Sequence, residues 1–152
     1  SNCEYDSVEK QRCQDIRYNF DILSEETKKH VEIMKRLKEG CQDPLQDEVV
    51  DLNNDGNMEI IILTSRAGCV SCHHRSAYIY YNNDLRLIKS GHELKIIPEP
   101  KKNGFYVVEG ILSKNEPLCC PSKALKIFYQ WDNSRSIHEF LPVKAVIENY
   151  PD

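Results

Sequence analysis

The sequence lacks the motifs that mark common catalytic sites. Its 152 residues contain no Gly-x-Ser-x-Gly elbow, no His-Glu-x-x-His pair, no phosphate-cradling glycine loop and no dinucleotide fingerprint. The histidines do not indicate a catalytic site either, because most stand alone in the sequence. The pair His73-His74 is more simply explained as an exposed loop segment. We therefore predict that the protein is not an enzyme.

A surplus of basic residues and a long apolar run are also missing. The 20 Lys and Arg residues are outnumbered by 24 Asp and Glu residues, so the net charge of −4 offers no basic surface for nucleic acid. The longest apolar stretch, about residues 58–63, is much shorter than the roughly 20 residues of a membrane-spanning helix. We expect one domain over residues 1–152, whose partner is a protein or an envelope component rather than a small-molecule substrate or a nucleic acid.

Cysteine, in contrast, is abundant, with seven residues. So many cysteines favour an oxidising compartment, where an exported protein uses them as disulfides. An odd count leaves one cysteine over. Cys3 is the natural candidate, because Ser1-Asn2 has the form of an expression-tag remnant and Cys3 would then be the first native residue.

A mature chain that begins with cysteine resembles a bacterial lipoprotein, in which that residue carries the lipid. The resemblance implies lipidation at Cys3, export to the periplasm or the cell surface, and membrane attachment only through the lipid anchor. The alternative is an arbitrary boundary that falls on a cysteine by chance. On the first interpretation, six cysteines remain for three disulfides, namely Cys13, Cys41, Cys69, Cys72, Cys119 and Cys120.

The pairing of these six cysteines has more than one solution. A helical hairpin would bring Cys13 towards Cys41. The other four can form cross-links from residues 69 and 72 to residues 119 and 120, or they can form a local 69–72 pair and a vicinal 119–120 pair. We favour the cross-links, because they would constrain a long segment of the chain.

The apolar pattern changes along the chain from helical to extended. Residues 5–23 carry an apolar stripe at helical spacing, and a second helix follows between the cap Ser24 and a left-handed stop at Gly40. From Asp47 onward, short strands alternate with polar turns, which is typical of an antiparallel meander. The predicted strands are 48–52, 58–64, 76–81, 85–89, 105–112, 123–131 and, more weakly, 136–141, followed by a short helix at 143–149. The sequence therefore predicts an α+β fold, in which a helical hairpin (3–45) packs on an antiparallel β-meander sheet (46–152) and disulfides staple the two.

One segment between two predicted strands has the composition of a calcium loop. Oxygen-bearing side chains occupy its positions 1, 3, 5 and 9, position 7 can offer its backbone carbonyl, and Gly56 permits the sharp turn. In chain order these five residues are Asp51, Asn53, Asp55, Asn57 and Glu59. Calcium prefers six to eight oxygen ligands. The segment is not an EF-hand, because position 12 is Ile62 rather than an acid. We predict a structural calcium site here; the alternative is a plain turn in which the side chains cap backbone amides.

The loop and its flanking strands resemble the β-hairpin calcium loop of integrin-like repeats of the FG-GAP and VCBS type. A second resemblance extends over about residues 47–132. The Asp-Gly turn, Cys69 and Cys72, the Cys-Cys-Pro-Ser motif at 119–122 and the Tyr-x-Trp-Asp strand end at 129–132 are similar to those of small bacterial exported proteins and lipoproteins of unknown function. This resemblance implies an exported domain with structural cysteines, acting as a non-enzymatic binding or structural module.

The segment Cys69-Val70-Ser71-Cys72-His73 permits other interpretations. It fits the Cys-x-x-Cys-His pattern of covalent haem attachment, although such motifs usually open a helix. A zinc site would combine Cys69, Cys72 and a histidine with Cys119 or Cys120. A thioredoxin-like redox pair would need a helix N-terminus in a parallel-sheet fold. A metal or haem protein that uses Cys69, Cys72 and His73 is thus the alternative function.

Overall fold

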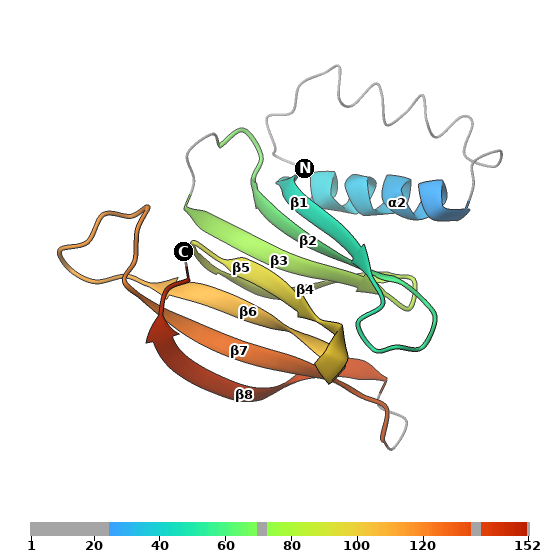
Figure 1. Cartoon of the computed structure of the whole chain (residues 1–152). Helices are drawn as coiled ribbons and strands as arrows, with labels where there is room; N and C mark the ends of the chain where they lie inside the picture. Colours follow the sequence, from blue (N-terminus) through green and yellow to red (C-terminus); the bar gives the residue numbers. More distant parts are fainter. Residues whose placement is uncertain (1–24, 70–72, 135–137, 152) are drawn as a thin grey trace.

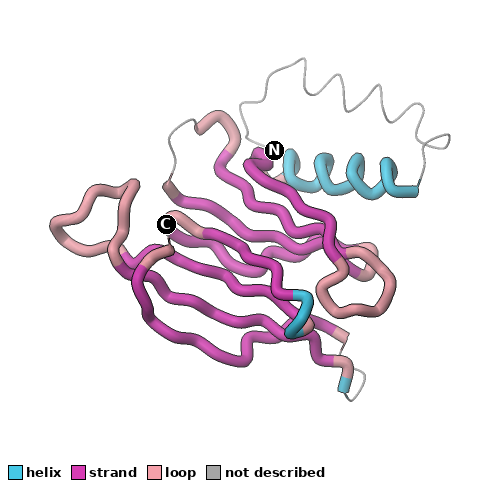
Figure 2. The backbone as a smooth tube through the Cα atoms, viewed as in Figure 1, coloured by secondary structure: helices cyan, strands magenta, loops and turns pink. Residues whose placement is uncertain are grey.

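The computed structural model describes residues 25–69, 73–134 and 138–151. Within these ranges, one α-helix precedes two four-stranded antiparallel sheets, and in each sheet the strands follow one another in chain order (Figures 1 and 2). The first sheet contains β1 (Gln42–Val50), β2 (Glu59–Arg66), β3 (His74–Tyr81) and β4 (Asp84–His92). The second contains β5 (Lys95–Glu99), β6 (Gly104–Ile111), β7 (Lys123–Asp132) and β8 (Glu139–Asn149), with a short 3-10 turn, η2 (Pro100–Lys102), between β5 and β6.

The predicted α+β fold, a helical hairpin on a single disulfide-stapled meander sheet, is wrong. The described chain is mostly β, and its strands form two sheets with a shared core rather than one. The meander does exist, but it is interrupted between β4 and β5. There Glu93 adopts a left-handed backbone conformation with φ 46°, and the chain passes from the first sheet to the second. Residue 93 itself is neither glycine nor proline, and the sequence does not show that the chain changes sheet here.

The first sheet is covered on both faces because the side chains of a strand alternate in direction. In β2, Ile61 and Leu63 point into the core shared with the second sheet, whereas Ile60 and Ile62 point the other way. Helix α2 (Glu25–Glu39) packs on this second face through Ile33 and Leu37, which is 1% exposed. The result is three layers: helix, first sheet and second sheet (Figure 1). A strand buried on both faces explains the continuous apolar run in β2.

Aromatic rings fill the core between the two sheets. Phe140 of β8 meets three rings, those of Tyr81, Phe105 and Trp131, at centroid distances of 5.3, 5.4 and 4.9 Å. Such tilted and edge-on pairs add to the free energy gained by burying the rings. These contacts join the end of β3 to the ends of β6, β7 and β8.

Helix α2 corresponds to the second predicted helix, but it ends differently from the prediction. Gly40 does not have a positive φ; the left-handed residue is Cys41, with φ 59°. The amides of Gly40 and Cys41 donate to carbonyls of the last helical turn, which closes the helix. The first predicted helix lies outside the described residues. Within the described ranges, no helix is long and apolar enough to cross a membrane.

Two strand predictions need correction. The residues at 143–149 are not a helix but the second half of β8, paired with β7 from Lys123↔Asn149 onward. Strand β5 is missing from the prediction, and it contains Pro98, a residue that is rare inside strands. The structure resolves this conflict by placing Pro98 on an edge strand. Pro44 in β1 and Pro142 in β8 also lie on edge strands, where a missing backbone N–H need not break a ladder.

Candidate metal centre

The loop between β1 and β2 brings three predicted ligands together. Val50, the last residue of β1, pairs with Glu59, the first of β2, so the segment 51–58 closes a hairpin. One carboxylate oxygen from each of Asp51, Asp55 and Glu59 lies within 4.8 Å of the others, and this acidic cluster can hold a metal ion. The prediction that these three residues converge is therefore confirmed.

The loop curves because its own carboxylates accept backbone hydrogen bonds. Oδ2 of Asp51 accepts from the amide of Gly56 at 2.9 Å, and its Oδ1 accepts from the amide of Asp55 at 3.2 Å. Oδ1 of Asp55 accepts from the amide of Asn57 at 2.8 Å. Gly56 has φ 88°, a conformation that other residues rarely adopt. The alternative prediction, that side chains of a good turn cap backbone amides, thus describes part of the same geometry.

Glu59 differs from the two aspartates because it is buried. The residue is only 3% exposed, and its Oε1 accepts a hydrogen bond from the amide of Leu52 at 2.8 Å. Burial, followed by the negative charges of Asp55 and Asp51, raises the pKa of Glu59 from 4.5 to about 7, against the opposing effect of the backbone hydrogen bonds. The cluster therefore holds unneutralised negative charge, which a bound cation would relieve.

The two predicted asparagine ligands lie beside this cluster. Nδ2 of Asn53 donates to Oδ2 of Asp55 at 3.3 Å, whereas its Oδ1 is buried without a hydrogen-bond partner. Asn53 and Asn57 line a cavity of about 240 Å³ that also contacts Asp55 and Glu59. A buried amide oxygen without a donor is costly, so Oδ1 of Asn53 is available for a cation.

The loop is fixed to the second sheet as well as the first. Nδ2 of Asn54 donates to the carbonyl of Pro100 at 2.8 Å and to Oδ1 of Asn103 at 2.9 Å, both in the turn between β5 and β6. Leu52, with 0% exposure, belongs to the core between the sheets. The loop therefore connects the two sheets at one end of the molecule.

A second polar cluster has no counterpart in the sequence-based predictions. Glu93, 8% exposed, bonds through its carboxylate to Nδ1 of His73 and approaches the guanidinium of Arg75 at 3.5 Å. Tyr150 donates its hydroxyl proton to the backbone carbonyl of Glu93. Nε of Arg75 and Nε2 of His92 are buried there without partners. Glu93 has a left-handed backbone conformation in this cluster, which the sequence pattern does not signal.

The disulfides agree only in part with the predicted pairing. Cys119 and Cys120 form a vicinal disulfide. The favoured prediction, a cross-link from residues 69 and 72 to this pair, is therefore wrong. The alternative of a local 119–120 pair is correct. It is the one cysteine pair at disulfide distance within residues 25–69, 73–134 and 138–151. Cys41 and Cys69 are each disulfide-bonded as well, but not to one another. Cys3, Cys13 and Cys72 lie outside the described residues, so lipidation stays a prediction. The Cys69-Cys72-His73 haem or metal site also stays one, but it would need Cys69 as a free thiol rather than in its disulfide.

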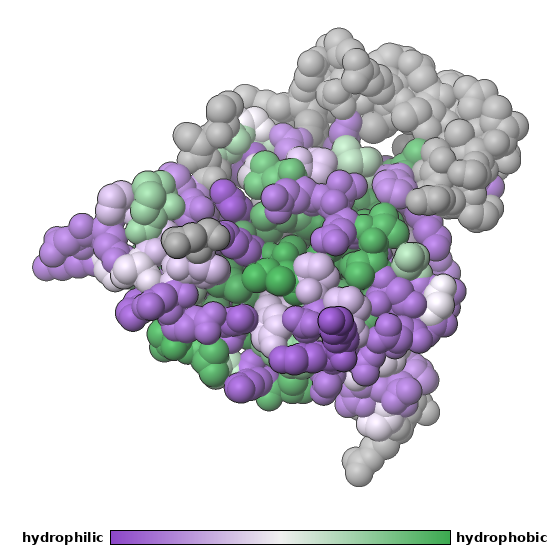
Figure 3. Space-filling model, in the orientation of Figure 1, coloured by the Kyte–Doolittle hydropathy of each residue, from purple (hydrophilic) through white to green (hydrophobic). Residues whose placement is uncertain are grey.

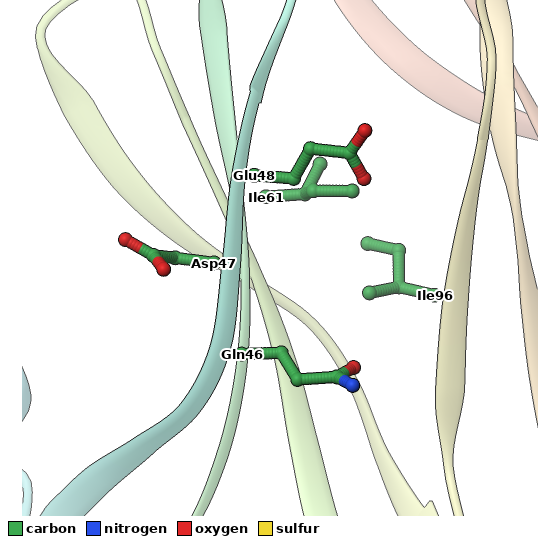
Figure 4. A pocket seen from close by; sticks show the side chains of 5 residues that line it. All are labelled: Gln46, Asp47, Glu48, Ile61 and Ile96. Carbon is green, nitrogen blue, oxygen red and sulfur yellow. The ribbon is translucent and has the colours of Figure 1, made fainter.

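A larger cavity of about 380 Å³ opens at the side of the two sheets, between β1 and β5 (Figure 4). Gln46 and Glu48 point from β1 towards Ile96 of β5, whereas Asp47 points away from the cavity. An inward-pointing charge on an edge strand discourages pairing with other strands.

No protein-family model, curated protein or solved structure matches the chain. The resemblances to integrin-like loops and to exported proteins with a Cys-Cys-Pro-Ser motif accordingly remain predictions.

Proposed function

We propose that the protein is a non-enzymatic binding or structural module of the bacterial envelope, in which the β1–β2 loop binds one structural Ca²⁺. The observation that carries the proposal is the convergence of the Asp51, Asp55 and Glu59 carboxylates within 4.8 Å. Export, and attachment through a lipid at Cys3, belong to the same proposal.

The chemistry of the donors supports calcium rather than a softer metal. The acidic cluster offers only oxygen, and the neighbouring Asn53 adds an amide oxygen that has no donor. Hard cations prefer oxygen, and Ca²⁺ tolerates irregular geometry better than Mg²⁺, which demands an octahedron. Water would complete the coordination on the side of the adjoining cavity.

The position of the site supports a structural role. Asp51 follows the end of β1 and Glu59 begins β2, so one cation would join both strands. Through Asn54 the same loop holds the turn between β5 and β6. A bound cation would therefore stabilise the contact between the two sheets.

The disulfides support export. Cys41, Cys69, Cys119 and Cys120 are all disulfide-bonded, a use of cysteine that fits an oxidising compartment. In that compartment calcium is available to extracellular modules even when they bind it weakly.

Isothermal titration calorimetry of the metal-free protein with CaCl₂ tests the proposal. We expect one saturable site, and Asp55→Asn should weaken binding at least about tenfold because it removes one charged ligand. The asparagine keeps the Oδ1 that accepts from Asn57, so the loop should still fold. Asp47→Asn is the matched control, since Asp47 is exposed on β1 outside the cluster and carries the same charge. Absence of saturable binding, or equal losses in both variants, would overturn the proposal.

A further inference from the structure

Strand β8 exposes a long edge and an apolar surface. It pairs with β7, and among the described residues no strand pairs with its other edge. Val143, Val146 and Ile147 on this strand are 56%, 38% and 70% exposed. Figure 3 shows the corresponding hydrophobic patch at the lower left, where the second half of β8 lies in Figure 1. Exposed edges of this kind are templates for pairing with another chain.

The hydrogen-bonding pattern of β8 determines which backbone N–H and C=O groups point to its free edge. The amide of Tyr150 donates to the carbonyl of Ser122 at 2.9 Å, which continues the β7–β8 ladder by one residue pair. In an antiparallel ladder the hydrogen-bonded residues alternate, so residues 144, 146 and 148 face β7 with their N–H and C=O groups. Ala145, Ile147 and Asn149 then direct these groups to the free edge.

The side chains at this edge are complementary to those of the same edge in a second copy of the chain. We propose that a second copy of the chain pairs with β8 in antiparallel fashion about a two-fold axis at Val146, which joins the two second sheets into one continuous sheet. Lys144 of each copy then stands opposite Glu148 of the other. Ala145 stands opposite Ile147 and donates and accepts the two hydrogen bonds of that pair. Val146 meets Val146 of the second copy.

This register satisfies charge, size and hydrogen bonding together. The two Lys144–Glu148 pairs lie on one face, and the small Ala145 beside the large Ile147 lies on the other. Lys126 of β7 already contacts Glu148 at 3.5 Å, so the carboxylate would lie between two ammonium groups. A closed two-fold pair also covers the edge and leaves no open end for a fibre.

The edge strands β1 and β5 do not offer this match. Strand β1 carries Asp43, Asp47 and Glu48, so self-pairing would gather negative charge. Strand β5 is five residues long and contains Pro98. Pro142 and the irregularity near Phe128/Tyr129 restrict the pairing to the second half of β8.

A charge exchange in the full chain tests the proposal. Sedimentation equilibrium should show a dimer for the unmodified protein. Lys144→Glu should weaken the dimer about tenfold, because both cross-strand pairs become repulsive. The double variant Lys144→Glu/Glu148→Lys should restore it. A monomer at every concentration, or a double variant no tighter than Lys144→Glu, would overturn the proposal.

Ile147→Pro provides a second test that spares the fold. The Ile147 N–H faces the free edge, so proline removes an interchain hydrogen bond and leaves the ladder to β7 intact. We expect a monomer whose melting temperature, measured at a concentration where the unmodified protein is also monomeric, is nearly unchanged. A dimer of unchanged affinity in Ile147→Pro would contradict the proposed edge.

Discussion

The amide of Leu52 donates a 2.8 Å hydrogen bond to Oε1 of Glu59. Leu52 is completely buried in the core between the two sheets, and Glu59 is the first residue of β2. The position of the innermost carboxylate of the acidic cluster is therefore set by packing of the sheets and not by the loop alone. This relationship would link metal binding at the cluster to the stability of the fold.

The raised pKa of Glu59 predicts how stability depends on pH. Its pKa is about 7 in the folded protein and 4.5 ordinarily, so between these values the folded state binds more protons than the unfolded state. Without calcium, the free energy of unfolding should therefore fall as pH rises from 4.5 to 7, by up to about 3 kcal/mol from this group. Denaturant unfolding at several pH values in EDTA measures this change.

Two comparisons isolate the contribution of Glu59. Glu59→Gln keeps a side-chain oxygen that can accept from the amide of Leu52, but it removes the titrating carboxyl group. In EDTA, the free energy of unfolding of this variant should therefore not fall between pH 4.5 and 7. Saturating calcium should abolish the fall in the unmodified protein, because the cation favours the ionised carboxylate. A Glu59→Gln profile parallel to that of the unmodified protein would mean that another group causes the change.

Local features of the fold could be predicted from the sequence. The carboxylates converge because their spacing within nine residues and the glycine turn suffice to curve the loop. The turn at Asn82 and Asn83 was likewise predictable, since both residues adopt the left-handed conformation that a two-residue hairpin requires.

Features that depend on distant contacts could not be predicted. The separation into two sheets depends on a left-handed glutamate, Glu93, held by His73 and Tyr150 from other parts of the chain. The second half of β8 has a composition compatible with a helix, and pairing with β7 determines that it is a strand. The pairing of Cys119 with its neighbour, rather than with a distant loop, is likewise not encoded in spacing.

Gly104 should be intolerant of any side chain. A Cβ at this position would overlap the backbone carbonyl oxygen of Tyr129 in the neighbouring strand, and backbone cannot move as a flexible side chain does. We expect Gly104→Ala to reduce the free energy of unfolding by about 3 kcal/mol or more, as measured by denaturant unfolding. Gly40→Ala is the matched control, because its nearest neighbour would be 3.6 Å away; an equal loss in both variants would refute the steric cause.

The vicinal disulfide should contribute little to stability. Its two cysteines are adjacent and exposed, so the bond closes almost no loop of the unfolded chain. Cys119→Ser/Cys120→Ser should lower the free energy of unfolding by no more than about 1 kcal/mol. Thermal melting under oxidising conditions measures this, and a much larger loss would assign the pair a packing role that its exposure does not indicate.

The most direct test of the calcium loop is a crystal structure of the protein grown with calcium. We predict one ion between Asp51, Asp55 and Glu59, with carboxylate oxygens at about 2.3–2.6 Å and an anomalous signal at that position. An amide oxygen of Asn53 within the same range would explain its lack of a hydrogen-bond donor. A well-ordered loop with no ion at saturating calcium would contradict the account and leave Asp51–Glu59 as a turn held by its own hydrogen bonds.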